Sequence, residues 1–192
     1  MIVIAISLSI FYFMKLDVYE AISTDISTYE TDCAIYENAS DFMPDLESLT
    51  DHTDLFYSHK TSASRFMGFV SEGLALFVQY DELLYKAKKE EVLNSYTFLD
   101  APVLEYNDEF YILPVTEFHY KNYHMKVVPD IEHPDSDACE SFALIGFDDE
   151  NKSIVYCYHY DIDLDYIAKQ DEDPEAEMCI FMDSKFEWKP TN

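Results

Sequence analysis

Residues 154–166 read IVYCYHYDIDLDY, and their strict alternation indicates a β-strand. Successive side chains of a strand point to opposite faces, so this run contains two sets of residues. One set is apolar and aromatic, and we expect it to pack inward: Ile154, Tyr156, Tyr158, Tyr160, Ile162, Leu164 and Tyr166. The other set begins with Val155, Cys157 and His159 and ends in carboxylates that we expect to face solvent: Asp161, Asp163 and Asp165.

The row Asp161, Asp163 and Asp165 is a weak candidate for a metal site. Together with Glu172 it matches the first, third, fifth and twelfth positions of a calcium-binding loop, whose ligands are oxygens. The sixth position of such a loop needs glycine, and here it is Tyr166. Same-face carboxylates on an extended strand also lie roughly 6.5 Å apart. We therefore favour a solvated face over a weak calcium site, and a true calcium loop is the least favoured alternative.

Several other stretches predict antiparallel hairpins. Three turns separate pairs of apolar runs: Asn107-Asp108 between 103–106 and 110–113, Lys121-Asn122 between 118–120 and 123–128, and residues 148–151 between 142–147 and 154–166. The second hairpin would place His119 opposite His124. Residues 66–80 predict a further hairpin that closes near Ser71-Glu72-Gly73.

Two stretches predict helices of more than three turns. Residues 81–94, DELLYKAKKEEVLN, contain no glycine or proline and begin with two acidic residues, which suit the positive end of a helix. Residues 174–187 follow Asp173 as a cap and begin with Pro174, and their apolar side chains form one stripe. Residues 40–49 predict a short helix. The chain is therefore expected to be an α+β protein with a mainly antiparallel meander sheet.

Residues 1–14, MIVIAISLSIFYFM, carry no charge. As a helix they cover about 21 Å, and an extension to residue 19 approaches the roughly 30 Å of a bilayer core. We expect a hydrophobic N-terminal helix over residues 1–19 that serves as a membrane anchor or uncleaved signal. A cleaved signal peptide and a buried core element are the alternatives. Residues 20–39 are then a Ser/Thr-rich connector, either a stalk or a partial helix, and residues 40–192 are an acidic α+β domain.

The composition limits the partners. The formal net charge is −27, from 39 acidic and 12 basic residues. Binding to nucleic acid or to an anionic lipid surface needs clustered cations, so we expect neither. A basic protein or a metal cation remains compatible with this charge. A hydrophobic content of 48% supplies enough apolar area for a folded core.

Motifs for catalysis are absent from the sequence. There is no G-x-S-x-G, glycine-rich phosphate loop, H-E-x-x-H or C-x-x-C, so we expect no enzyme activity and no catalytic or cofactor-binding residue. Four cysteines allow either three disulfide pairings or free buried thiols: Cys33, Cys139, Cys157 and Cys179.

The favoured function is a membrane-tethered, single-pass binding domain that lies outside the cytoplasm and takes an unknown protein or small ligand. The alternative is a soluble acidic inhibitor or immunity-type protein that binds a basic partner. A metal-dependent hydrolase is a weaker third hypothesis. The sequence leaves the ligand, the membrane orientation, the cleavage of the N-terminal segment and the oligomeric state open.

Overall fold

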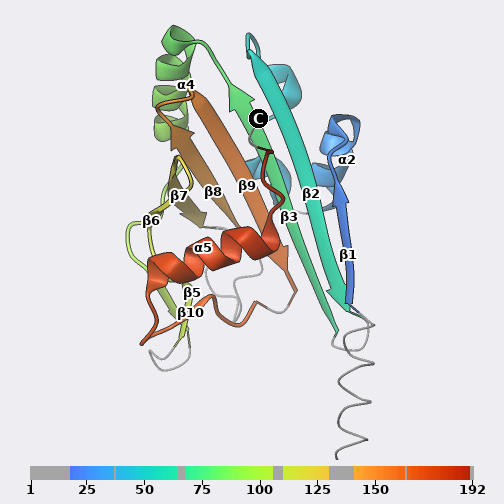
Figure 1. Ribbon diagram of the computed structural model, residues 1–192, viewed down its shortest axis with the longest axis vertical. Helices are drawn as coiled ribbons and strands as arrows, with labels where there is room; N and C mark the ends of the chain where they lie inside the picture. The colour runs from blue at the N-terminus through green and yellow to red at the C-terminus, as the bar shows by residue number, and fades with distance from the viewer. Residues whose placement is uncertain are drawn as a thin grey trace, which may run out of the picture.

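A computed structural model describes residues 18–36, 38–64, 68–105, 110–129, 141–162 and 164–190 (Figure 1). Its main element is a seven-stranded sheet in which all neighbouring strands are antiparallel. In spatial order the strands are β1 (Val18–Ser23), β2 (Asp54–Ser64), β3 (Phe69–Gln79), β9 (Ser153–Asp161), β8 (Ser141–Asp148), β7 (Tyr123–Pro129) and β6 (Glu117–Tyr120). Two meanders, β1–β3 and β6–β9, therefore join where β3 pairs with β9.

Helices cover both faces of this sheet. On one face a buried cluster joins the sheet to α2 (Tyr29–Ile35), α3 (Ala39–Phe42), the 3-10 turn η2 (Leu46–Ser48) and α4 (Glu82–Ser95). The opposite face packs against α5 (Pro174–Lys185) and a small sheet of β10 (Ala168–Lys169), β5 (Phe110–Leu113) and β4 (Val103–Glu105). Figure 1 shows α5 crossing this second face. The central strands β3, β8 and β9 are consequently buried on both sides.

Both long helices confirm their predictions. The Asp81 carboxylate accepts hydrogen bonds from the backbone amides of Leu83 and Leu84, at 2.9 Å each, and so caps α4. Asp173 caps α5 in the same way, with Pro174 as the first helical residue. Because the caps satisfy amides that have no partner within the helix, these starting points could be read from the sequence. Helix α5 ends at Lys185, two residues earlier than we expected.

The predicted α+β class with a mainly antiparallel sheet is confirmed, with four α-helices among the described residues. Three predicted hairpins form as expected, namely β4–β5, β6–β7 and β8–β9. In the second of these His119 stands opposite His124, and the two rings stack with centroids 4.9 Å apart.

The predicted turn at Ser71-Glu72-Gly73 is wrong, because these residues lie inside β3. Strand β3 pairs with β2 without interruption from Phe69 to Gln79. Gly73 is small for a different reason: a Cβ atom there would lie 2.0 Å from the carbonyl oxygen of Lys185. The glycine lets the end of α5 approach the sheet backbone closely. In the sequence, a glycine with this packing role looks the same as a glycine in a turn.

The expected solvent face of residues 154–166 is also wrong for the part that forms β9. The strand ends at Asp161, and both of its faces are buried. Val155 and Cys157 belong to the buried cluster beneath α5. His159 packs against Phe181 and Phe186 on the same face. The row of carboxylates predicted a face exposed to solvent. Instead, the Asp161 carboxylate pairs with the ammonium of Lys185, in the last turn of α5.

The segment predicted as a stalk or partial helix has regular structure. Strand β1 pairs with β2 along its whole length, the 3-10 turn η1 (Ile26–Thr28) follows, and α2 buries Tyr29 and Cys33. Residues 40–49 form α3 and η2, separated at Pro44, in place of one helix. Among the described residues no helix is long and apolar enough to cross a bilayer. The hydrophobic helix and membrane anchor predicted for residues 1–19 fall almost entirely on residues 1–17, which lie outside the described part of the chain. They therefore stay predictions, and so does the division into domains.

Candidate functional site

The carboxylates singled out in the sequence do not gather around one point among the described residues. Asp161 is buried, and the ammonium of Lys185 lies 3.1 Å from its carboxylate. Asp165 is exposed, and Asp163 lies outside the described residues. Within the described ranges no group of three His, Cys, Asp or Glu side chains could hold a metal ion. Because Asp163 is not among them, the calcium hypothesis stays a prediction.

His159 is a buried polar residue that sequence reasoning did not single out. Its ring lies among Phe142, Phe181 and Phe186, and among the described residues neither ring nitrogen has a hydrogen-bond partner of ordinary geometry. Burial lowers the pKa of this imidazole to about 3, and the nearby Lys185 ammonium acts in the same direction. The side chain is therefore neutral at physiological pH and fills space beneath α5.

The most distinctive surface is formed by residues 18–54, which we call the acidic layer: β1, η1, α2, α3, η2 and their connections. No lysine or arginine occurs between Lys15 and Lys60. Among the residues of the layer that the structure describes, the exposed carboxylates are Glu20, Asp25, Glu30, Asp41, Asp45, Glu47, Asp51 and Asp54. Of these, Asp54 pairs with Lys189 of the C-terminal tail. The layer is thus a continuous stretch of chain with one sign of charge.

Apolar side chains are exposed within the same layer. Tyr19 and Ile22 project from the edge strand β1, and Ile35 at the end of α2 is 63% exposed. Such residues placed among charges are common at protein–protein contacts, where the apolar groups supply burial and the charges supply orientation. The acidic layer therefore has both components of a docking surface.

A polar network fastens this layer to the sheet. The Asp32 carboxylate of α2 accepts hydrogen bonds from the Tyr57 hydroxyl of β2, at 2.9 Å, and from Thr28, at 2.7 Å. His59 of β2 lies between this carboxylate, 3.5 Å from one ring nitrogen, and Glu72 of β3, 2.8 Å from the other. Three separate segments of the chain meet here, which is why the sequence alone gave no sign of the network.

The charge state of His59 follows from its neighbours. Burial lowers the pKa of the imidazole, but the Glu72 and Asp32 carboxylates more than offset this, so the pKa lies above its ordinary value. The protonated ring can donate to both carboxylates, one from each nitrogen. Because the two carboxylates approach opposite sides of the ring, they do not converge on a single ion. The network is suited to holding α2 in place.

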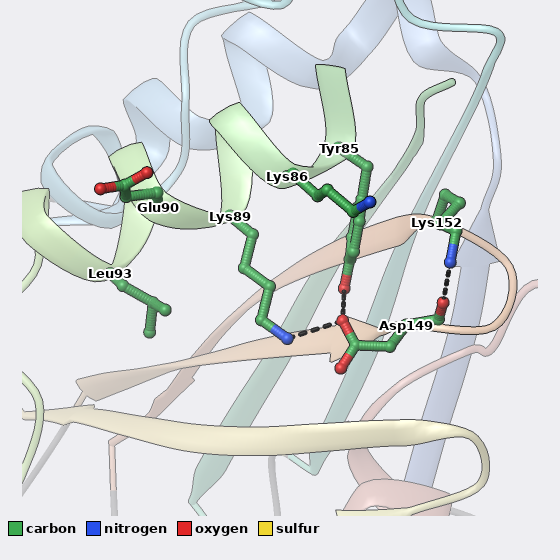
Figure 2. Close-up of a pocket in the computed structure, with 7 residues that line it drawn as sticks. All are labelled: Tyr85, Lys86, Lys89, Glu90, Leu93, Asp149 and Lys152. Atoms are coloured by element: carbon green, nitrogen blue, oxygen red, sulfur yellow. Dashed lines mark hydrogen bonds and ion pairs between the residues drawn. The ribbon is translucent and has the colours of Figure 1, made fainter. Parts of the chain in front are cut away.

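Cations gather where α4 meets the turn between β8 and β9. Lys86 and Lys89 of α4 and Lys152 of the turn surround a depression of about 430 Å³ (Figure 2). The Asp149 carboxylate accepts hydrogen bonds from Lys89, at 2.6 Å, and from the Tyr85 hydroxyl, at 2.7 Å. Lys152 donates to the backbone carbonyl of Asp149. These contacts tie the turn to the helix.

This arrangement makes the charge distribution uneven. The chain has only 12 basic residues, and three of them line this depression beside α4. The acidic layer has none. A molecule with such a distribution presents one strongly negative surface and one region of mixed charge, which orients it in the field of a charged partner.

The thiols give no sign of disulfide chemistry in the described part of the chain. Cys33, Cys157 and Cys179 are free there, and Cys139 lies outside it. Burial raises the pKa of the Cys33 thiol to about 12, and it raises that of Cys157 as well. Both are protonated at physiological pH and are poor nucleophiles.

The chain matches no protein-family model, no curated protein and no solved structure with which it was compared.

Proposed function

We propose that this chain is a binding protein without catalytic activity, and that its acidic layer docks a basic protein partner. The observation that carries the proposal is the run of eight exposed carboxylates, with no lysine or arginine, on the described part of residues 16–59. A surface with a large excess of negative charge attracts a positively charged partner and accelerates the encounter. Exposed Tyr19, Ile22 and Ile35 would then supply apolar contact after the encounter.

The network around His59 supports this use of the layer. A docking surface that is already ordered avoids part of the entropy cost of binding. Tyr29, Asp32 and Cys33 lie on one face of helix α2, and the burial of Tyr29 and Cys33 and the hydrogen bond from Tyr57 to Asp32 hold that face in place. The carboxylates of the layer are therefore presented from a fixed backbone.

The test compares two triple variants that change the net charge equally. The first, Asp41→Asn with Asp45→Asn and Glu47→Gln, neutralises part of the acidic layer. The second, Asp165→Asn with Asp171→Asn and Glu175→Gln, neutralises exposed carboxylates between the end of β9 and the first turn of α5. Binding of cytochrome c, used as a small basic test protein, is measured by calorimetry at several salt concentrations.

We expect the layer variant to weaken binding by about tenfold at low ionic strength and the control variant to weaken it far less. The difference should shrink as salt is added, because screening removes interactions between exposed charges. Equal losses in the two variants would show that net charge alone matters, and the acidic layer would lose its role.

A membrane tether is a second candidate feature, favoured by the uncharged run of residues 1–14 just before β1. A membrane tether at residues 1–14 would lead directly into β1, the first strand of the acidic layer, and would place that layer near the bilayer. The domain would lie outside the cytoplasm. Membrane fractionation of the full chain and of a variant lacking residues 2–14 tests it. Loss of carbonate-resistant membrane association on deletion is expected, and recovery of both forms in the soluble fraction would contradict it.

A further inference from the structure

A second pocket, of about 150 Å³, lies between η2 and the C-terminal half of α4. Tyr80, which follows β3, and Tyr156 of β9 form part of its lining and are almost fully buried. Among the described residues the Tyr80 hydroxyl has no hydrogen-bond partner. A buried hydroxyl without a partner is costly, so this pocket invites a ligand that would satisfy it.

Further polar groups surround the same space. Burial raises the pKa of Tyr80 to about 12, and the Glu91 carboxylate contributes to this rise. Burial also raises the pKa of Tyr156, and the neighbouring Tyr80, Tyr96 and Glu91 raise it further. Three tyrosines and one carboxylate line the pocket together: Tyr80, Tyr96, Tyr156 and Glu91.

The lining contains one ammonium, that of Lys88, which pairs with Glu91, and several oxygens that can accept hydrogen bonds. Three of its hydroxyls donate their proton to a backbone carbonyl: Ser48 to Asp45 at 2.7 Å, Ser95 to Glu91 at 2.8 Å and Tyr96 to Phe42 at 3.0 Å. Each of these oxygens keeps lone pairs that can accept a hydrogen bond. The Glu91 carboxylate at the rim is an acceptor as well. A fitting ligand must bring its own N–H or O–H groups.

We propose that this pocket binds a primary alkylammonium group. Such a group carries three N–H donors and a positive charge, which match the acceptor oxygens, the Glu91 carboxylate and the faces of the tyrosine rings. Glu91 already holds an ammonium at the rim, because Lys88 lies 2.9 Å from its carboxylate. The net charge of −27 also favours a cation over an anion. This inference does not depend on the proposed function.

The experiment is calorimetric titration of the full-length chain with n-butylammonium. Two ligands of similar size serve as controls: 1-butanol lacks the charge, and tetramethylammonium lacks N–H donors. We expect n-butylammonium to bind at least about tenfold more tightly than either control.

Four variants locate the binding. Glu91→Gln should weaken it about tenfold, and Tyr80→Phe should weaken it several-fold. Tyr80→Phe should also raise the melting temperature of the unliganded chain, because it removes the unpartnered hydroxyl, and this readout shows that the variant folds. Lys88→Met should strengthen binding, since it removes the competing ammonium. Tyr85→Phe, on the same helix but facing the depression of Figure 2, should leave it unchanged.

Equal binding of 1-butanol, or unchanged binding in both Glu91→Gln and Tyr80→Phe, would overturn the proposal and leave a pocket that only holds water. Loss of binding in Lys88→Met would overturn it too, because the site would then need the Lys88 ammonium that the proposal treats as a competitor. A blocked lysine amide and a free polyamine, titrated in parallel, identify the source of the ammonium group. Tighter binding of the first indicates a protein side chain, and tighter binding of the second indicates a free amine.

Discussion

Two histidines of the sheet respond to folding in opposite ways. His159 is buried among phenylalanines and has a lowered pKa, whereas His59 sits between two carboxylates and has a raised one. Folding therefore releases a proton from His159 when the medium is acidic. It takes up a proton at His59 when the medium is near neutral. The direction of each shift determines where in pH its contribution to stability is lost.

For His159 the lowered pKa means that stability is complete above the ordinary pKa of 6.5 and falls as the pH drops toward the folded value of about 3. Between pH 7.5 and pH 5 this costs about 2 kcal/mol of unfolding free energy. Replacement His159→Leu should remove that part of the acid sensitivity. Urea denaturation at both pH values measures it.

Phe142→Leu is the control for this replacement, because it changes packing beside His159 without changing a titrating group. It should lower stability by a similar amount at both pH values. The assignment fails if His159→Leu keeps the full pH dependence of the original chain.

For His59 the raised pKa means the reverse: its contribution is complete below pH 6.5 and is lost as the pH rises through the folded value. His59→Gln should therefore destabilise the protein more at pH 5.5 than at pH 9, on the order of 1–3 kcal/mol at the lower pH. Thermal unfolding at the two pH values checks this. A loss that is larger at pH 9 would contradict a protonated His59 between Asp32 and Glu72.

At the scale of elements, the contact of α5 with β3 depends on one missing side chain. The Lys185 carbonyl oxygen occupies the place of a Cβ atom at Gly73, and backbone atoms cannot rotate away as a flexible side chain can. Gly73→Ala should cost about 1–3 kcal/mol in denaturant unfolding and should loosen the end of α5.

Gly146 provides the comparison. A Cβ atom there would meet the sulfur of Met125 at 2.4 Å and a methyl group of Val155 at 2.7 Å, and both belong to side chains. Gly146→Ala should therefore cost less than Gly73→Ala. A larger loss for Gly146→Ala would mean that the end of α5 yields more readily than the core around Met125.

The elements that the sequence predicted are those specified by neighbouring residues. The caps at Asp81 and Asp173 and the turn at Lys121-Asn122 act within a few positions, so helices and hairpins could be predicted. The pairing of β3 with β9 and the burial of the second face of β9 depend on residues far apart in the chain. Gly73 was read as a turn because its partner, the Lys185 carbonyl, lies more than a hundred residues away.

The same distinction applies to the candidate site. The acidic layer has a sequence signal, which is the absence of lysine and arginine between Lys15 and Lys60. The network of Asp32, His59 and Glu72 had none, since its members come from α2, β2 and β3. The hydroxyl-lined pocket likewise combines η2, α4 and β9 with Tyr80.

At the scale of the whole molecule, the account depends on an uneven distribution of charge over a sheet covered on both sides. The acidic layer runs from the edge strand β1 over the face of the sheet that α4 also covers, and α5 crosses the opposite face (Figure 1). The two surfaces offer nearly matched exposed isoleucines: Ile35 on α2 is 63% exposed, and Ile180 on α5 is 59% exposed. A photo-crosslinking amino acid at either position therefore reports contact on its own surface.

The most direct measurement compares crosslinking from position 35 with crosslinking from position 180 in an extract of the source cells, followed by mass spectrometry of the adducts. We expect adducts from position 35 to contain basic proteins and to disappear when the salt concentration is raised, with few adducts from position 180. Equal yields from the two positions, or partners at position 35 that are acidic and resist salt, would contradict docking through the acidic layer.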